Sequence, residues 1–201
     1  MKIVTLVSGG IDSTLMSILA DEKDFELFPL FVDYGQRSVK LEWKACLYNH
    51  LKHKLPKPKR MNLNGFGKLI HSGLTDKRMR VKEDAFLPGR NTLFLLAASS
   101  YAYHVQSRNV AIGLLTDKYS LFPDQTNEFI RKTESFISTV LEYEIKILAP
   151  LIGFNKAEVI KLAESKRIGK TYSCHSGNPK PCGKCISCLE ITNALKYLKG
   201  G

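Results

Sequence analysis

The stretch "LVSGGIDSTL", residues 6–15, places two adjacent glycines between an apolar run and a helical pattern. The run Lys2–Val7 has the composition of a strand, and Asp12–Glu22 carry apolar residues at helical spacing. A glycine turn that leads into a helix leaves unpaired backbone N–H groups aimed at one spot, and the helix dipole adds roughly half a positive charge there. The stretch therefore predicts a phosphate site, with a plain helix cap by Asp12 or Ser13 as the alternative.

The rest of the chain alternates between strand and helix patterns. This alternation predicts a doubly wound, Rossmann-like parallel sheet in an α/β fold, with helices on both faces. A polar stretch from Asn64 to about Asp84 fits neither pattern and is a candidate lid. The further strands are expected at 26–34, 59–63, 109–114 and 144–151, and the further helices at 38–51, 91–106, 127–143 and 156–166.

Charge and hydropathy limit the classes of function. The chain has 201 residues, with 30 Lys and Arg against 19 Asp and Glu, so its net charge is +11. This excess favours a polyanionic ligand such as a nucleotide, a nucleic acid or an acidic partner. The basic run 50–60 contains no aromatic residues that could stack on bases, so a solvated loop is expected there. No window approaches the roughly 18 apolar residues of a membrane span, so we expect a cytoplasmic protein without membrane contact.

Four cysteines lie close together near the carboxyl end. Their spacing is C, seven residues, C, two, C, two, C. Four thiolates with CxxC pairs fit a tetrahedral Zn²⁺ site with no open position, which would be structural. An iron–sulfur cluster, a disulfide or an inert role are the alternatives. The fifth cysteine, Cys46, lies in an apolar helical pattern and is expected to be buried. The predicted metal ligands are Cys174, Cys182, Cys185 and Cys188.

The phosphate motif matches neither the dinucleotide pattern GxGxxG nor the Walker pattern. Its core, "SGGIDS", resembles the pyrophosphate loop of the PP-loop ATP pyrophosphatase superfamily. The resemblance implies an adenine nucleotide alpha hydrolase-type fold, ATP as the cofactor, and Asp12 as a partner of Mg²⁺. It implies 1–170 as the ATP-binding domain and 171–201 as the zinc segment with a C-terminal helix. The implied ATP-binding residues in the loop are Ser8, Gly9, Gly10, Ile11, Asp12 and Ser13.

Longer segments are similar to the 7-cyano-7-deazaguanine synthase family, which is QueC-like. They are "FVDYGQRSVKLEWKA", "LPGRNTLFLLAAS", "APLIGFNKAEVIKLA" and the four-cysteine tail. The resemblance implies a homodimeric ligase that adenylates 7-carboxy-7-deazaguanine, a small deazapurine. Ammonia then gives an amide, and a second ATP gives the nitrile, a precursor of queuosine and archaeosine.

The same resemblance suggests roles for single residues. Arg90 would bind a phosphate or carboxylate, unless it is a surface arginine paired with an acid. Asn91 would either cap a helix or contact substrate, and Lys156 would reach a phosphate or lie exposed in the first turn. Asp33 ends a strand, where open α/β sheets bind ligands, and Gln36 and Arg37 would face ATP or substrate. Asp12, Arg90 and Lys156 are the expected catalytic residues.

One segment departs from the family pattern. In "KYSLFPDQT", residues 118–126, the expected substrate-binding residues Tyr119, Ser120 and Asp124 keep their places, but a leading acid, a glycine and a Cys-Arg pair are replaced. The tail also has Ile191 where the family commonly has arginine. These changes leave open a different acceptor amine, such as a protein partner in bacterial antiphage defence. Two further alternatives are a PP-loop enzyme that modifies tRNA bases and a catalytically silent zinc protein.

Overall fold

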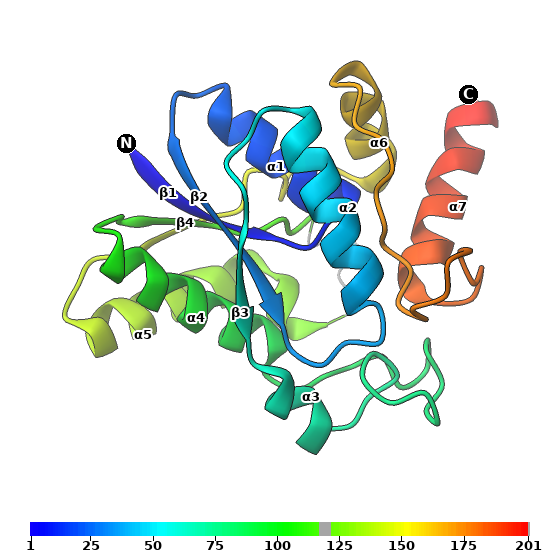
Figure 1. The fold of residues 1–201 in the computed structure, drawn as a ribbon, viewed down its shortest axis with the longest axis horizontal. Coiled ribbons are helices and arrows are strands. Elements are labelled where there is room, and N and C mark those ends of the chain that lie inside the picture. The colour runs from blue at the N-terminus through cyan, green and yellow to red at the C-terminus, as the bar shows by residue number, and fades with distance from the viewer. Residues whose placement is uncertain (117–121, 201) are drawn as a thin grey trace.

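The computed structural model describes residues 1–116 and 122–200. Its centre is a five-stranded sheet in the order β3-β2-β1-β4-β5, and all neighbouring strands pair in parallel (Figure 1). The doubly wound α/β fold is thus confirmed. The strands are β1 (Lys2–Val7), β2 (Glu26–Asp33), β3 (Lys59–Asn62), β4 (Asn109–Ala111) and β5 (Lys146–Leu148). The helices are α1 (Ile11–Asp21), α2 (Val39–Lys52), α3 (Asn64–Leu69), α4 (Arg90–His104), α5 (Asn127–Leu141), α6 (Lys156–Ser165) and α7 (Ile186–Gly200), with a short 3-10 turn η2 (Pro123–Gln125).

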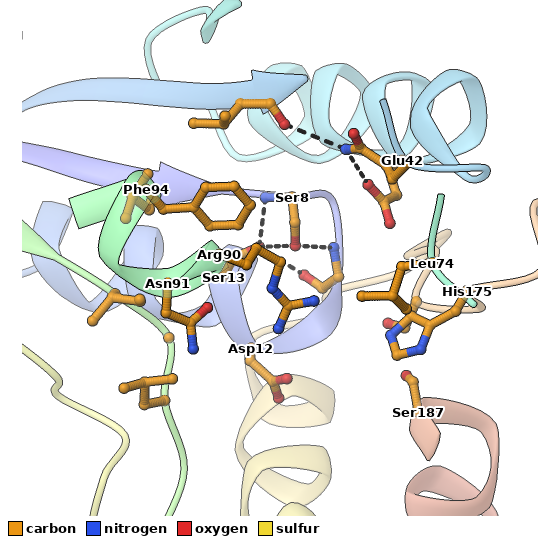
Figure 2. Close-up of a pocket in the computed structure, with 18 of the residues that line it drawn as sticks. Ser8, Asp12, Ser13, Glu42, Leu74, Arg90, Asn91, Phe94, His175 and Ser187 are labelled. Carbon is orange, nitrogen blue, oxygen red and sulfur yellow. Dashed lines mark hydrogen bonds between the residues drawn. The ribbon is translucent and has the colours of Figure 1, made fainter. Parts of the chain in front are cut away.

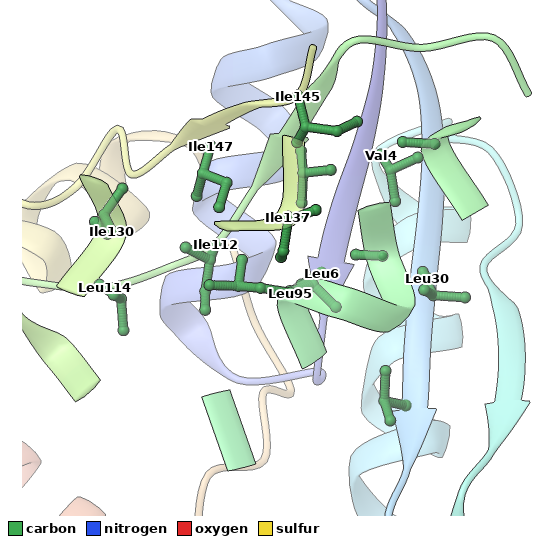
Figure 3. Close-up of a cluster of buried hydrophobic side chains, with 14 residues drawn as sticks. Val4, Leu6, Leu30, Leu95, Ile112, Leu114, Ile130, Ile137, Ile145 and Ile147 are labelled. Atoms are coloured by element: carbon green, nitrogen blue, oxygen red, sulfur yellow. The ribbon is translucent and has the colours of Figure 1, made fainter. Parts of the chain in front are cut away.

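The side chains of β1 alternate between two buried layers, as expected for a strand covered on both faces. Val4 and Leu6 pack with α4 and α5 in one cluster, which Figure 3 shows from within. Ile3 packs with α1 and α6 on the other face, and Val7 contacts Cys46 of α2 there. The predicted burial of Cys46 is confirmed, since its side chain is 1% exposed. Because helices cover both faces of the sheet, only its edges remain open, and a ligand site can form at the carboxyl edge.

Two predicted strands are shorter than the sequence suggested. Strand β4 ends at Ala111, because the chain then passes under the first turn of α1, where Gly113 lies close to the backbone of Asp12 and Ser13. Strand β5 ends at Leu148, shortly before Pro150, which has no N–H to donate to a sheet. Both strands therefore stop at the carboxyl edge of the sheet.

The stretch 64–84, which fits neither pattern in the sequence, folds into α3 followed by a series of turns. The Gly73 N–H donates to the carbonyl of Asp84 at 2.6 Å and closes the turns into a compact segment. Leu74 and Ala85 are each 3% exposed and pack in one cluster with Tyr34. The candidate lid is thus a packed wall in this structure.

The basic run 50–60 is only partly a loop. Helix α2 extends through Lys52, and Lys59 and Arg60 belong to β3. His50 is 2% exposed, so the expectation of a solvated segment was wrong for this residue. Its Nδ1 lies 2.8 Å from the carbonyl of Pro56, which ties the end of α2 to the following turn.

The burial of His50 predicts that the protein loses stability in mild acid. Burial lowers its pKa below the usual 6.5, because the charged imidazolium is poorly solvated. The unfolded chain therefore binds a proton first, and stability falls as the pH drops from about 6.5 toward the folded pKa. Urea unfolding at pH 7.5 and 5.5 measures this loss. His50→Asn keeps a donor for Pro56 but cannot titrate, so it should lose less stability; an unchanged loss would show that His50 is not the cause.

The C-terminal segment packs onto the domain at two places. The Tyr172 N–H donates to the Gly9 carbonyl at 3.0 Å, and Ala194 of α7 packs with Ala157 and Ile160 of α6. Figure 1 shows α7 beside α6, past the carboxyl edge of the sheet. No helix in the described part of the chain is long and apolar enough to cross a membrane.

Candidate active site

A cavity of about 330 Å³ lies at the carboxyl ends of the strands (Figure 2). Its floor comes from β1, β2 and the chain after β4, and its walls come from α4, the 70–88 segment and the C-terminal segment. Open parallel sheets bind ligands at this edge. Its polar lining includes Ser8, Gly10, Asp12, Ser13, Gln36, Glu42, Arg90, Asn91, Tyr172, Ser173, His175, Ser187 and Glu190.

The phosphate loop forms one end of this cavity. The Ser8 hydroxyl lies 3.1 Å from that of Ser13, which accepts from the Ser8 N–H at 3.1 Å. The Gly10 N–H donates to the Ser8 hydroxyl at 3.3 Å. Gly10 is the N-cap of α1 and no side chain caps this end, so the simple capping alternative is wrong. The first N–H groups of α1, from Ile11 onward, have no partner within the helix, as an anion site requires.

Gly9 is the residue that allows this loop. Its φ is +81°, and a Cβ there would overlap the carbonyl oxygen of Glu42 and lie 2.7 Å from the Cys46 backbone nitrogen. We therefore expect Gly9→Ala to weaken ATP binding about tenfold or more, because strain of about 1–3 kcal/mol must distort the loop or displace α2. Isothermal titration with a nonhydrolysable ATP analogue measures this. Gly153→Ala is the matched control, since Gly153 has open space around it; equal affinities in both variants would contradict the assignment.

Lys156 joins two carboxylates beside the loop. Its ammonium lies 2.8 and 2.7 Å from the two Asp12 oxygens and 3.3 Å from Glu190. Asn155 caps α6 and exchanges two hydrogen bonds with Glu158, which places Lys156 at the first helical position. Burial alone lowers the pKa of Lys156, but the two carboxylates outweigh it and raise the pKa. Asp12, Lys156 and Glu190 line a second cavity of about 160 Å³, and Asp12 and Glu190 line the first one as well.

Arg90 and Asn91 enter the cavity from the start of α4. Gly89, with φ +72°, is the N-cap, so Asn91 does not cap this helix. The Asn91 amide instead donates to the Asp124 carbonyl at 2.9 Å and lines the cavity. Figure 2 shows the Arg90 guanidinium pointing into the cavity. Burial raises the pKa of the neighbouring Tyr34 to about 12, although the Arg90 charge acts against this rise.

Among the other predicted site residues, some lie off the cavity and others line it with their side chains already engaged. Asp33 does not line the cavity; it accepts from the Arg60 guanidinium at 2.6 Å. Arg37 also lies off the cavity and donates to the Gly73 carbonyl at 3.1 Å, which holds the wall segment in place. Gln36 lines the cavity, but its amide is engaged by neighbouring protein groups. The side chain of Asp124 is not among the lining groups, and Tyr119 and Ser120 lie outside the described residues.

The four predicted cysteines form one cluster. All four Sγ atoms lie within 4.8 Å of one another, and none of these cysteines is in a disulfide. A tetrahedral ion with bonds of about 2.3 Å holds its thiolates about 3.8 Å apart, so the cluster fits one metal ion. Burial raises the pKa of Cys174, but hydrogen bonds from Ser176 and the Cys182 N–H outweigh it and bring the pKa to about 6. At Cys174 this favours the thiolate form that metal binding needs, whereas burial raises the pKa of Cys185 to about 12 and also raises that of Cys188.

The cysteine cluster is physically continuous with the cavity. Tyr172, Ser173 and His175 precede or follow Cys174 and line the cavity. Ile186, Ser187 and Glu190, which surround Cys185 and Cys188 in sequence, do the same. The cysteine-containing segment 172–190 therefore supplies one wall of the site.

Sequence reasoning missed several polar groups of the cavity, among them three titratable side chains. Glu190 follows Cys188 by two residues, Glu42 lies one helical turn after Ser38, and His175 adjoins a cysteine. Burial, followed by the charge of Arg90, lowers the pKa of His175 to about 4, so the imidazole is neutral near pH 7. The cavity thus combines an anion-binding loop, the cationic side chain of Arg90 and hydrogen-bonding groups, and Lys156 lies beside it against Asp12. This set suits the attack of a bound acid on a nucleotide phosphate.

Comparison with known proteins gives a consistent result. The family model described as "Queuosine biosynthesis protein QueC" matches residues 2–199. The chain is 34% identical over 210 residues to the 7-cyano-7-deazaguanine synthase of Prochlorococcus marinus (strain MIT 9301), covering 96% of this chain and 92% of the relative. It is 36% identical over 207 residues to that of Picrophilus torridus, covering 94% of this chain and 84% of the relative.

Solved structures show the same fold at lower identity. The NMN synthetase of Francisella tularensis superposes with a TM-score of 0.61 at 13% identity, covering 99% of this chain and 76% of that one. The U34-tRNA thiolase NcsA of Methanococcus maripaludis, which carries a [4Fe-4S] cluster, gives 0.59 at 19% identity, covering 100% and 67%.

Proposed function

Because the chain belongs to the QueC family of queuosine biosynthesis proteins, we propose that it is an ATP-dependent ligase that converts 7-carboxy-7-deazaguanine into 7-cyano-7-deazaguanine. One observation supports this proposal most directly: the phosphate loop and Arg90 open into the same cavity, so a nucleotide and an acid can meet there. We further propose that the protein acts in the cytoplasm as a homodimer.

In the first step, the substrate carboxylate attacks the α-phosphate of ATP, and the bond to pyrophosphate breaks. The loop from Ser8 to Ser13 would hold the departing pyrophosphate through its backbone N–H groups. Arg90 would hold the carboxylate or the α-phosphate, because its positive charge attracts their negative charge. Asp12 would hold Mg²⁺, which neutralises charge on the phosphates when bound. Lys156 is then free to turn from Asp12 toward the phosphates.

Ammonia attacks the acyl adenylate, and AMP leaves with one carboxylate oxygen, giving the amide. The amide oxygen attacks a second ATP, pyrophosphate leaves again, and loss of the second AMP with two protons gives the nitrile. Each turnover would therefore consume two ATP and release two AMP. The neutral imidazole of His175 lies in the cavity and is able to accept a hydrogen bond from the attacking nitrogen.

We propose that the cysteine cluster holds a structural Zn²⁺, because four thiolates complete its tetrahedral shell and leave no coordination position open for a substrate. The ion would tie the segment around Cys174 and Cys185 to the cavity wall and take no part in the reaction.

A second candidate transfers the activated acid to another amine, such as one on a protein partner. The departures in residues 118–126 favour it, because Phe122 and Gln125 at the end of this segment line the cavity. A PP-loop enzyme that modifies tRNA bases has less support. The U34-tRNA thiolase NcsA and a 4-thiouridine synthetase share only the fold with this chain, at 19% and 21% identity.

Mass spectrometry distinguishes the candidates. The protein is mixed with magnesium ATP and 7-carboxy-7-deazaguanine, with and without ammonium. The synthase proposal predicts the nitrile and two AMP per nitrile only when ammonium is present. Accumulation of the adenylate or the amide alone would support the second candidate, and a failure to release any pyrophosphate would refute both.

A further inference from the structure

Glu42 is a buried acid that faces the cavity and has no role in the phosphate loop. It lies in the first turn of α2, is 9% exposed, and lines the cavity. Burial raises its pKa, which reflects the cost of keeping its charge away from water. No ion pair within 4.0 Å involves Glu42 in the part of the chain that the structure describes. Hydrogen bonds from Ser38 and Gln36 lower this pKa, as does the charge of Arg90 without an ion-pair contact. A ligand in the cavity can therefore supply further donors to this buried carboxylate.

The carboxylate of Glu42 is held in a fixed orientation. The Ser38 hydroxyl donates to one oxygen at 2.6 Å, and the Gln36 amide donates to the other at 2.9 Å. The Gln36 amide is itself fixed, because its oxygen accepts from the Tyr34 N–H at 3.0 Å and its nitrogen also donates to the Val32 carbonyl at 3.3 Å. Each carboxylate oxygen therefore keeps acceptor capacity for a second donor.

The surroundings of Glu42 suit a flat ring. Figure 2 shows Glu42 on one side of the cavity with Arg90 across from it, and Phe94 and Leu74 on the flanking walls. The lining combines these apolar side chains with few charged ones, as ligand pockets for aromatic rings do. Arg90 attracts an acid, so a ring that carries a carboxylate would turn that group toward Arg90 and its opposite edge toward Glu42.

We propose that Glu42 is the specificity residue that recognises the base of the substrate, through the ring N–H and the exocyclic amino group of a 2-amino-4-oxopyrimidine edge. Two parallel N–H donors match the two oxygens of one carboxylate, as a guanidinium does. The pairing edge of adenine offers an amino donor beside a ring acceptor, which one carboxylate cannot satisfy. Glu42 would thus keep adenine out of the substrate position, with Gln36 and Ser38 as positioning residues. This inference rests on the proposed function, because it assigns an edge of the proposed substrate.

The wild-type protein provides the first test, which needs no variant. The steady-state rate of AMP release is measured with 7-carboxy-7-deazaguanine and with the analogue that lacks the exocyclic amine. We expect kcat/KM to be at least tenfold lower for the analogue, because one Glu42 oxygen then loses its donor. Equal kcat/KM values for the two acids would overturn the inference.

Glu42→Gln is the second test, because it keeps the shape of the side chain but replaces one acceptor with a donor. We expect the KM for the deazaguanine acid to rise at least tenfold, the KM for ATP to stay within twofold, and the discrimination against the analogue to shrink. Glu144→Gln is the matched control, since Glu144 is exposed and pairs with Arg108. A raised KM for ATP with an unchanged KM for the acid would instead assign Glu42 to the nucleotide. If the wild type releases no AMP with the deazaguanine acid, the proposed function itself fails.

Discussion

Replacing Cys185 with serine is expected to abolish the proposed metal binding and to reduce AMP formation more than a hundredfold. Cys185 is fully buried, and its Sγ lies within 4.8 Å of the other three Sγ atoms. Structural zinc in small peptides contributes about 10–16 kcal/mol to folding, so the loss of one ligand should release the segment that it holds. That segment forms one wall of the cavity and hydrogen-bonds the phosphate loop through Tyr172.

Three measurements check this prediction: metal content per chain, affinity for an ATP analogue, and the rate of AMP release. All three should fall together in Cys185→Ser. Cys46→Ala is the control, because Cys46 is buried outside the cluster and should leave the metal content unchanged. A variant that loses its metal and keeps its activity would separate the cluster from the active site and contradict our account.

Lys156→Met should lower the rate of adenylation about 100- to 1000-fold, the range found when a group that stabilises transition-state charge is removed. Lys156 is 8% exposed and is held by Asp12 and Glu190 at the phosphate loop. Methionine fills much of the same space but brings no charge to the pyrophosphate as it leaves. Single-turnover pyrophosphate formation with saturating ATP isolates this step from ATP binding and from the later attack by ammonia.

Lys166→Met is the matched control for Lys156→Met. Lys166 follows the same helix, α6, and its ammonium pairs with Glu22 at 2.6 Å on the surface. Exposed ion pairs contribute little, so this variant should keep nearly the full rate. If both variants react equally fast, Lys156 holds Asp12 and Glu190 together without acting on ATP.

The start of the fold could be predicted from the sequence because its signals are local. The apolar run Lys2–Val7, the glycines and the periodicity of the next helix lie within about twenty residues, and the cysteine spacing fixes its cluster in the same way. Helix and strand types were therefore predicted well, while the ends of β4 and β5 depend on a packed neighbour and a proline.

The pairings in the site could not be predicted, because they join distant parts of the chain. Lys156 and Asp12 lie 144 positions apart, and Glu190 reaches them from a third element. Arg37 fits the family pattern, yet the fold turns it toward Gly73 and the wall segment. A residue type and a motif give the chemistry that is available, and only the tertiary structure decides which groups meet.

The central claim is that the acid is activated by transfer to AMP, and an oxygen label tests it most directly. The carboxylate of 7-carboxy-7-deazaguanine is prepared with ¹⁸O in both positions and incubated with magnesium ATP and ammonium. Our account predicts that each of the two AMP molecules released per nitrile carries one ¹⁸O and that the pyrophosphate carries none. Label in inorganic phosphate, formation of ADP, or unlabelled AMP would contradict adenylation of the carboxylate.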